Sequence, residues 1–207
     1  MVFLGLSGLA SLLVENNLNA EEYKLKENKE TQIIKPTLEE ITTLLSKTPQ
    51  EILEPAIKGG GIKKFEYTMN TTPEDFYKFL NNQKGNNKIF IFLYLDQTTP
   101  IKNNWKRFSG RDVSSASATV FYYISINLRK RGIDYAYVFF EIVDFYGRSN
   151  WEKLHKMFNV NEIDFPSWAE FVKRKDNYKL NEIGSAGILS EDIIKYIELN
   201  VEEYSKK

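Results

Sequence analysis

The hydrophobic pattern of the chain predicts strands that alternate with helices. Its strongest feature is an unbroken apolar run over residues 89–95, in which most side chains are β-branched or aromatic. Such a run is typical of a central strand buried on both faces of a parallel or mixed sheet. Residues 62–69 alternate between apolar and polar side chains and predict an earlier strand, and the apolar segment 134–145 predicts a later one. The pattern therefore indicates an α/β fold, with a central mixed sheet flanked by helices.

Residues typical of helix starts indicate where the helices lie between these strands. The segment TPED, from Thr72 to Asp75, has the capping residue and proline of a helix start. Ser190 stands before an apolar-faced segment, and we expect it to cap the last helix. The remaining predicted elements are a short helix at 103–108, helices at 113–130 and 150–158, a turn and strand at 164–172, and an edge strand at 179–183.

Two short helices are predicted before the first strand. Thr37 and Thr48 are each followed three residues later by a glutamate, the spacing of a capping box. A run of three glycines at 59–61 then predicts the end of the second helix and a hinge. We therefore divide the chain into a partly helical N-terminal extension, residues 1–61, and a main domain, residues 62–207.

The first residues, Met1 to Val14, are apolar and rich in small side chains. The segment is short for a membrane-spanning helix. It is similar to the apolar part of a secretory signal, although no lysine or arginine precedes it. It also fits an apolar arm docked on a partner, or a buried helix. The first interpretation favours an exported, cell-envelope or organellar protein, with membrane association through Met1 to Val14.

Composition excludes several kinds of chemistry. The 28 basic and 28 acidic residues cancel, so nucleic-acid binding, which needs a positive field, is not favoured, although local basic patches stay open. The chain has no cysteine and a single histidine, His155, which excludes disulfides, thiolate catalysis and Cys- or His-rich metal sites. The serines between Ser114 and Ser117 have no histidine near them in sequence, so they predict a small-residue helix face. We expect no catalytic residue, metal or cofactor.

The order of these elements resembles the thioredoxin fold, from about residue 62 to residue 204. Residues 89–102 resemble the central strand and the active-site turn that follows it. Pro166 stands at the place of the cis-proline of that family, and the segment from Gly187 to Ser190 is similar to its Gly-x-x-Ser opening of the last helix. The resemblance implies a thioredoxin-like fold whose functional face combines the active-site turn with the proline loop.

The chain departs from this family where the redox chemistry would take place. The family motif Cys-Gly-Pro-Cys, followed by lysine, is replaced by Thr98, Thr99, Pro100, Ile101 and then Lys102. A threonine hydroxyl cannot form a disulfide or replace a low-pKa thiolate. The buried aspartate that moves protons in the family falls at Phe92. The resemblance therefore implies a redox-inactive protein that is not an enzyme.

Recognition of other proteins is the function that remains for this face. We expect a structural or adaptor module within a larger assembly, holding an extended segment beside Pro166. The residues predicted to bind are Thr98, Thr99, Pro100, Ile101, Trp105, Phe165 and Pro166.

Two alternatives of other classes stay open. One is a glutathione- or small-ligand-binding protein or enzyme, in which Thr98 or Tyr94 orients a thiol. The other is a chaperone-like peptide binder with a large apolar patch. At single positions, Thr99 also fits a plain helix cap before Pro100, and Pro166 also fits an element retained only for folding.

Overall fold

The computed structural model describes residues 32–83, 87–95, 111–143 and 147–207. Contacts divide the chain into two units, Met1–Ile33 and Ile34–Lys207. The division predicted after Gly61 therefore differs from the one that the contacts give. Met1 to Val14, on which the predicted export and membrane association depend, lie outside the described residues, as does the short helix predicted at 103–108.

Within the described part of the chain, five strands form one mixed sheet in the order β1-β3-β2-β4-β5. The strands β1, β3 and β2 run parallel to one another. β4 runs antiparallel to β2, and β5 runs antiparallel to β4. This confirms the predicted α/β class with a central mixed sheet. The strands are β1 (Lys63–Tyr67), β2 (Lys88–Leu95), β3 (Tyr135–Ile142), β4 (Ser167–Arg174) and β5 (Asn177–Ser185).

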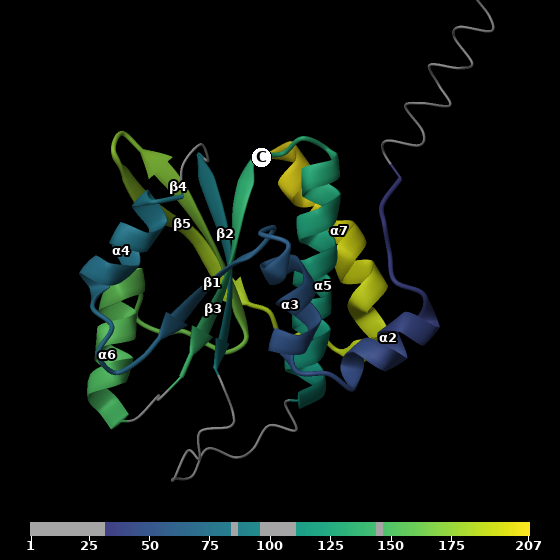
Figure 1. Ribbon diagram of the computed structural model, residues 1–207, viewed down its shortest axis with the longest axis horizontal. Coiled ribbons are helices and arrows are strands. Elements are labelled where there is room, and N and C mark those ends of the chain that lie inside the picture. Colours follow the sequence, from purple (N-terminus) through teal and green to yellow (C-terminus); the bar gives the residue numbers. More distant parts are fainter. Residues whose placement is uncertain (1–31, 84–86, 96–110, 144–146) are drawn as a thin grey trace, which may run out of the picture. The chain divides into compact units, whose positions relative to one another are not determined.

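Helices cover both faces of the sheet (Figure 1). One face carries α4 (Pro73–Asn81) and α6 (Gly147–Phe158), and the other carries α5 (Arg111–Lys130) and α7 (Ile193–Lys206). Two shorter helices, α2 (Leu38–Leu45) and α3 (Pro49–Lys58), pack against α5. They therefore belong to the same compact unit as the sheet.

The central strand β2 is buried along both faces, as its apolar run predicts. Ile89, Ile91 and Leu93 lie in the core shared with α4 and α6. The alternate residues Phe90 and Phe92 contact Phe121 of α5, with ring centroids 5.5 Å apart in each pair. Because strand side chains alternate between the two faces, only an unbroken apolar run supplies both cores.

The run of glycines forms a tight end to α3. The N–H of Gly61 donates to Ala56 O at 2.8 Å, and the N–H of Gly60 donates to Ile57 O at 3.0 Å. Gly60 has φ 71°, a left-handed conformation that glycine adopts without a steric penalty. The chain therefore turns from α3 into β1 within four residues that stay hydrogen-bonded to the helix.

The start of the last helix differs from the prediction. A 3-10 turn, Ser190–Asp192, precedes α7, and its N-cap position is held by Leu189 with no side-chain hydrogen bond. Leu189 is the last extended residue, so the Ser190 hydroxyl already lies inside the turn and cannot cap it from outside. The acidic side chains Glu191 and Asp192 still stand at the positive end of the helix dipole.

The cap of α4 gives a stability prediction. Thr72 Oγ1 accepts a hydrogen bond from the Asp75 N–H at 3.1 Å, and the Thr72 N–H donates to Asp75 Oδ2 at 2.9 Å. We expect Thr72→Ala to lower the free energy of unfolding by about 1 kcal/mol, measured by urea denaturation. Thr42→Ala, which removes a hydroxyl bonded only within α2, is the control, and its expected change is within about 0.5 kcal/mol.

This cap also predicts a dependence on pH. The backbone N–H of Thr72, and then its hydroxyl, hold the pKa of Asp75 below its ordinary value. A carboxylate with a lowered pKa stabilises the folded state above its unfolded pKa and loses that effect as the pH falls through the folded pKa. The difference between the wild type and Thr72→Ala should therefore shrink in acid. An unchanged difference at acidic pH would contradict a contribution from the hydrogen bond between the Thr72 hydroxyl and the Asp75 carboxylate.

Candidate functional site

The structure describes two of the seven residues predicted to bind a partner. Pro166 is buried immediately before β4, and its peptide bond with Phe165 is cis. Its carbonyl accepts a hydrogen bond from the Ala186 N–H at 2.8 Å, which ties the start of β4 to the end of β5. The other five residues lie outside the described ranges: Thr98, Thr99, Pro100, Ile101 and Trp105.

Phe165 and Tyr94 are both engaged in aromatic packing. Phe165 is half-buried and stacks on Trp151 of α6, with ring centroids 6.0 Å apart. Tyr94, which the glutathione alternative uses to orient a thiol, is buried and stacks on Phe139 at 6.0 Å. Of this pair, Phe165 presents the larger accessible surface, on the α6 side of the sheet.

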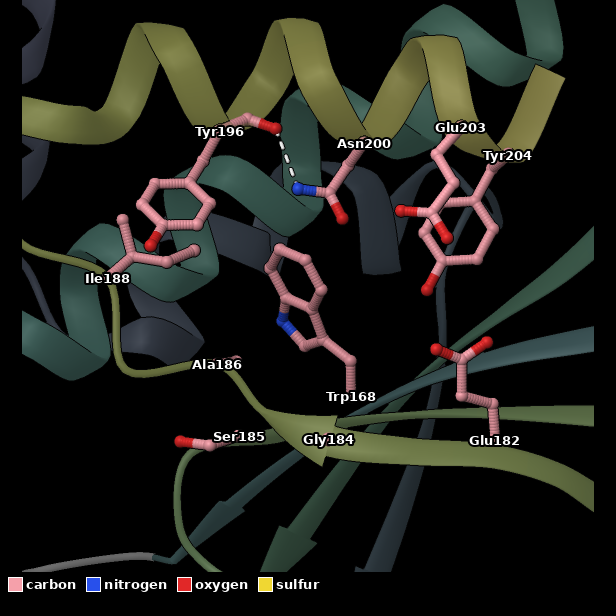
Figure 2. Close-up of a pocket in the computed structure, with 10 residues that line it drawn as sticks. All are labelled: Trp168, Glu182, Gly184, Ser185, Ala186, Ile188, Tyr196, Asn200, Glu203 and Tyr204. Carbon is pink, nitrogen blue, oxygen red and sulfur yellow. Dashed lines mark hydrogen bonds between the residues drawn. The ribbon is translucent and has the colours of Figure 1, made fainter. Parts of the chain in front are cut away.

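A groove opens on the other side of the sheet, two residues beyond Pro166. Its floor is Trp168 of β4, and its walls come from β5 and α7 (Figure 2). The cavity volume is about 190 Å³. Phe165 faces α6 and Trp168 faces α7, so the structure does not bring these two aromatic side chains together. The lining residues are Trp168, Glu182, Gly184, Ser185, Ala186, Ile188, Tyr196, Asn200, Glu203 and Tyr204.

The floor of the groove has an aromatic face and an unused donor. Phe90 meets the Trp168 ring edge to face at 6.0 Å and supports it from the core. The Trp168 Nε1 atom is buried, and no atom of the described residues accepts a hydrogen bond from it. A buried N–H group without an acceptor costs free energy.

Gly184 keeps the space above Trp168 empty. The two residues are paired in the register between β4 and β5. A Cβ atom added at Gly184 would meet no other atom within 4 Å. Any larger residue at this position would place its side chain in this open space, so the glycine is what keeps it vacant.

One end of the groove is polar, and its charges are paired. Lys207 Nζ lies 2.8 Å from Glu182 Oε2 and 3.2 Å from Glu203 Oε1. Burial works against the charge of Lys207, but the hydrogen bonds to Glu182 and Glu203 outweigh it and raise the pKa of the lysine. Burial raises the pKa of Tyr204 and outweighs the opposing charge of Lys207, so the hydroxyl stays protonated. This end therefore offers neutral hydrogen-bonding groups and a cluster in which one ammonium is shared by two carboxylates.

The buried acid Glu170 serves the fold. Its carboxylate accepts hydrogen bonds from Tyr135 Oη and Asn181 Nδ2, both at 2.9 Å, and lies 3.4 Å from Lys88 Nζ. Burial, and then the charge of Glu170, raise the pKa of Tyr135, which keeps the tyrosine a donor. Asn181 is the extra residue where the β4–β5 register shifts. The acid is fully partnered, so it has no free oxygen aimed at a substrate.

Other candidate catalytic groups are also used structurally. Ser115 donates to Lys47 O at 2.6 Å, and Ser117 donates to the carbonyl oxygens of Val113 and Ala186, so both hydroxyls hold α5 to its neighbours. His155 is half-buried against the Trp151 ring, at 4.9 Å. Within the described ranges, no group of three or more His, Cys, Asp or Glu side chains could hold a metal ion.

Sequence reasoning did not find the groove. Trp168 falls within the turn and strand predicted at 164–172, and its position opposite Gly184 depends on the β4–β5 register. An aromatic residue on one predicted strand and a glycine on the next were the only signals available. The groove combines an aromatic floor with a polar rim.

Comparison with known proteins leaves the site to be interpreted from its own geometry. No family model, no curated protein and no solved structure matches this chain. Among the described residues, none of the helices combines the length and the apolar composition that crossing a membrane requires.

Proposed function

We propose that this chain is a redox-inactive thioredoxin-like protein that binds other proteins, as a structural or adaptor module of a larger assembly. The element order β1-α4-β2-α5-β3-α6-β4-β5-α7 is the order on which the resemblance rests, and Pro166 precedes β4 as the resemblance implies. The chain has no cysteine, so it cannot form the dithiol that redox members use.

The observation that carries the proposal is the open groove over Trp168, at the edge of the sheet. β5 is the last strand in the sheet order. Among the described residues, no backbone hydrogen bond joins the outer edge of β5 between Glu182 and Ser185 to another segment. An unpaired strand edge beside an aromatic pocket is suited to an extended peptide, whose backbone pairs with the edge and whose side chains fill the pocket.

The binding mode follows from these groups. A partner segment pairs with β5 from Glu182 to Ser185 and places an apolar side chain on the Trp168 ring, in the space left by Gly184. The proposed surface thus lies beside the predicted proline loop, with Trp168 as its central residue.

Filling the groove should weaken peptide binding without harming the fold. We expect Gly184→Val to occupy the space over Trp168, because the added atoms have room and valine favours strands. Peptides are selected on the wild-type chain from a random display library, and their dissociation constants are measured by fluorescence polarisation. The expected loss of affinity in Gly184→Val is about tenfold or more. Thermal unfolding should show an unchanged or slightly raised midpoint.

The matched control is Glu66→Val, which places the same side chain on the exposed opposite edge strand. It should bind the selected peptides as the wild type does. Failure to select any peptide, or equal binding by the wild type and Gly184→Val, would refute the proposed site. Reduction of insulin disulfides by the purified chain would refute its redox inactivity. Stabilisation by millimolar glutathione would favour the small-ligand alternative.

A further inference from the structure

Two basic side chains, Lys63 and Arg129, line one hollow at the start of β1 and β3. The hollow has a volume of about 290 Å³ and shares no lining residue with the groove over Trp168. Gly60 and Gly61 bound it on one side, and the segment from Tyr135 to Tyr137 bounds it on another. It therefore provides a second, separate place where a ligand can bind.

Arg129 is held in place by an aromatic ring and has no acidic partner. Its Cζ atom lies 4.8 Å from the centroid of the Tyr137 ring, which is 2% exposed. Within the described residues, neither a carboxylate nor a carbonyl oxygen accepts a hydrogen bond from the guanidinium, and Lys63 forms no ion pair. Arg129 is exposed at its outer side, and desolvation lowers its pKa below the ordinary value.

The glycines are what allow Arg129 to take this position. A Cβ atom on Gly61 would overlap the guanidinium. The N–H groups of Gly60 and Gly61 already donate to carbonyl oxygens of α3. Recognition of an anion in the hollow therefore falls to the two side chains and not to the backbone of the glycine turn.

We propose that Arg129 and Lys63 bind the phosphate group of a small phosphorylated molecule. The guanidinium lies over the Tyr137 ring, and its N–H groups can donate parallel hydrogen bonds to phosphate oxygens. The ammonium of Lys63 adds a second positive charge, so the pair matches a phosphate dianion better than a single carboxylate. A hollow of about 290 Å³ accommodates a phosphate with a short substituent and is at the low end for larger ligands.

The test is an NMR titration of the full chain, observing backbone amides, with inorganic phosphate at constant ionic strength. Chloride is the reference anion, and glycerol 3-phosphate is the second arm. We expect saturable shifts at Gly60, Gly61 and Lys63, with a dissociation constant of about 1 mM. Tighter binding of glycerol 3-phosphate would identify a phosphate monoester as the ligand class, and equal binding would identify free phosphate.

Three variants decide the assignment. Arg129→Gln removes the guanidinium, and Gly61→Ala keeps both charges but displaces the guanidinium at its flexible end. Each should weaken phosphate binding by about tenfold, and Lys63→Gln by a smaller factor of about three to five. Lys156→Gln, which removes an exposed lysine of α6, should leave it unchanged.

Equal phosphate affinity in the wild type and Gly61→Ala would overturn the proposal, as would shifts that chloride reproduces. If Arg129→Gln does not fold, Gly61→Ala and Lys63→Gln still decide the outcome, because neither removes a core side chain. The peptide-binding variant Gly184→Val should bind phosphate as the wild type does. Failure of either proposed site is therefore distinguishable from failure of the other.

Discussion

Phe92→Asp should leave the protein largely unfolded at neutral pH. Phe92 has no exposed surface and stacks between Phe121 and Phe139, with ring centroids 5.5 and 6.1 Å away. The substitution removes a large core side chain, at a cost of about 3–5 kcal/mol. It also buries a carboxylate that has no partner, which adds several kcal/mol. The sum is comparable to the whole stability of an ordinary domain, about 5–15 kcal/mol.

Two further variants separate the terms of this prediction. Phe92→Leu keeps an apolar side chain and should cost about 1–1.5 kcal/mol, measured by guanidinium denaturation. Phe92→Asn has the shape of the aspartate without its charge, so the gap between the two at neutral pH measures the buried charge. Desolvation raises the pKa of a buried carboxyl in the folded state. The penalty is therefore full above that raised pKa and disappears as the pH falls below the unfolded pKa.

A folded, cooperative Phe92→Asp at neutral pH would contradict this account. It would mean that the core between α5 and the sheet admits water or a partner for the carboxylate. Near-ultraviolet circular dichroism of the variant, compared with Phe92→Leu, provides the measurement.

Phe76→Ala should cost about 3–5 kcal/mol, the second large effect, because it empties the centre of the core under α4. Phe76 has no exposed surface. Its ring meets five other aromatic rings at centroid distances between 5.3 and 5.6 Å. These rings belong to Phe65, Tyr77, Phe140, Phe158 and Phe171.

Phe79→Ala, one turn further along α4, is the matched control. Phe79 is half-buried and meets the ring of Phe65 at 4.9 Å. Its loss should cost about 1–2 kcal/mol, since less apolar area is returned to water. Urea denaturation of both variants gives the comparison. Equal losses would mean that the cluster around Phe76 relaxes to fill the cavity.

Much of the fold could be predicted because its signals are local. The unbroken apolar run predicts the strand β2 that it forms, and the capping boxes predict the starts of α2, α3 and α4 at which they stand. The prediction was wrong at Ser190, where a 3-10 turn begins one residue earlier than a capped helix would. Whether Ser190 caps the helix depends on whether the helical turn begins at residue 190 or at residue 191. Local sequence propensities do not define a helix start to within one residue.

The candidate site was harder to predict. The resemblance alone points to Phe165 and Pro166. The stacking of Phe165 on Trp151 and the hydrogen bond from Ala186 to Pro166 join residues distant in sequence, so local patterns do not predict them. Trp168 and Gly184 are 16 positions apart in numbering, and only the β4–β5 register places them opposite each other. Arg129 and Gly61 are still further apart, and their contact depends on α5 lying beside the turn from α3 into β1.

The amino acids alone established the α/β class, the doubly buried central strand and the absence of thiol chemistry, because composition and hydrophobic period need no knowledge of distant neighbours. The groove over Trp168 and the hollow beside Arg129 arose from the packing of the fold. Each is an empty space between segments remote in sequence, and such a space exists only once strand register and helix packing have brought its walls together.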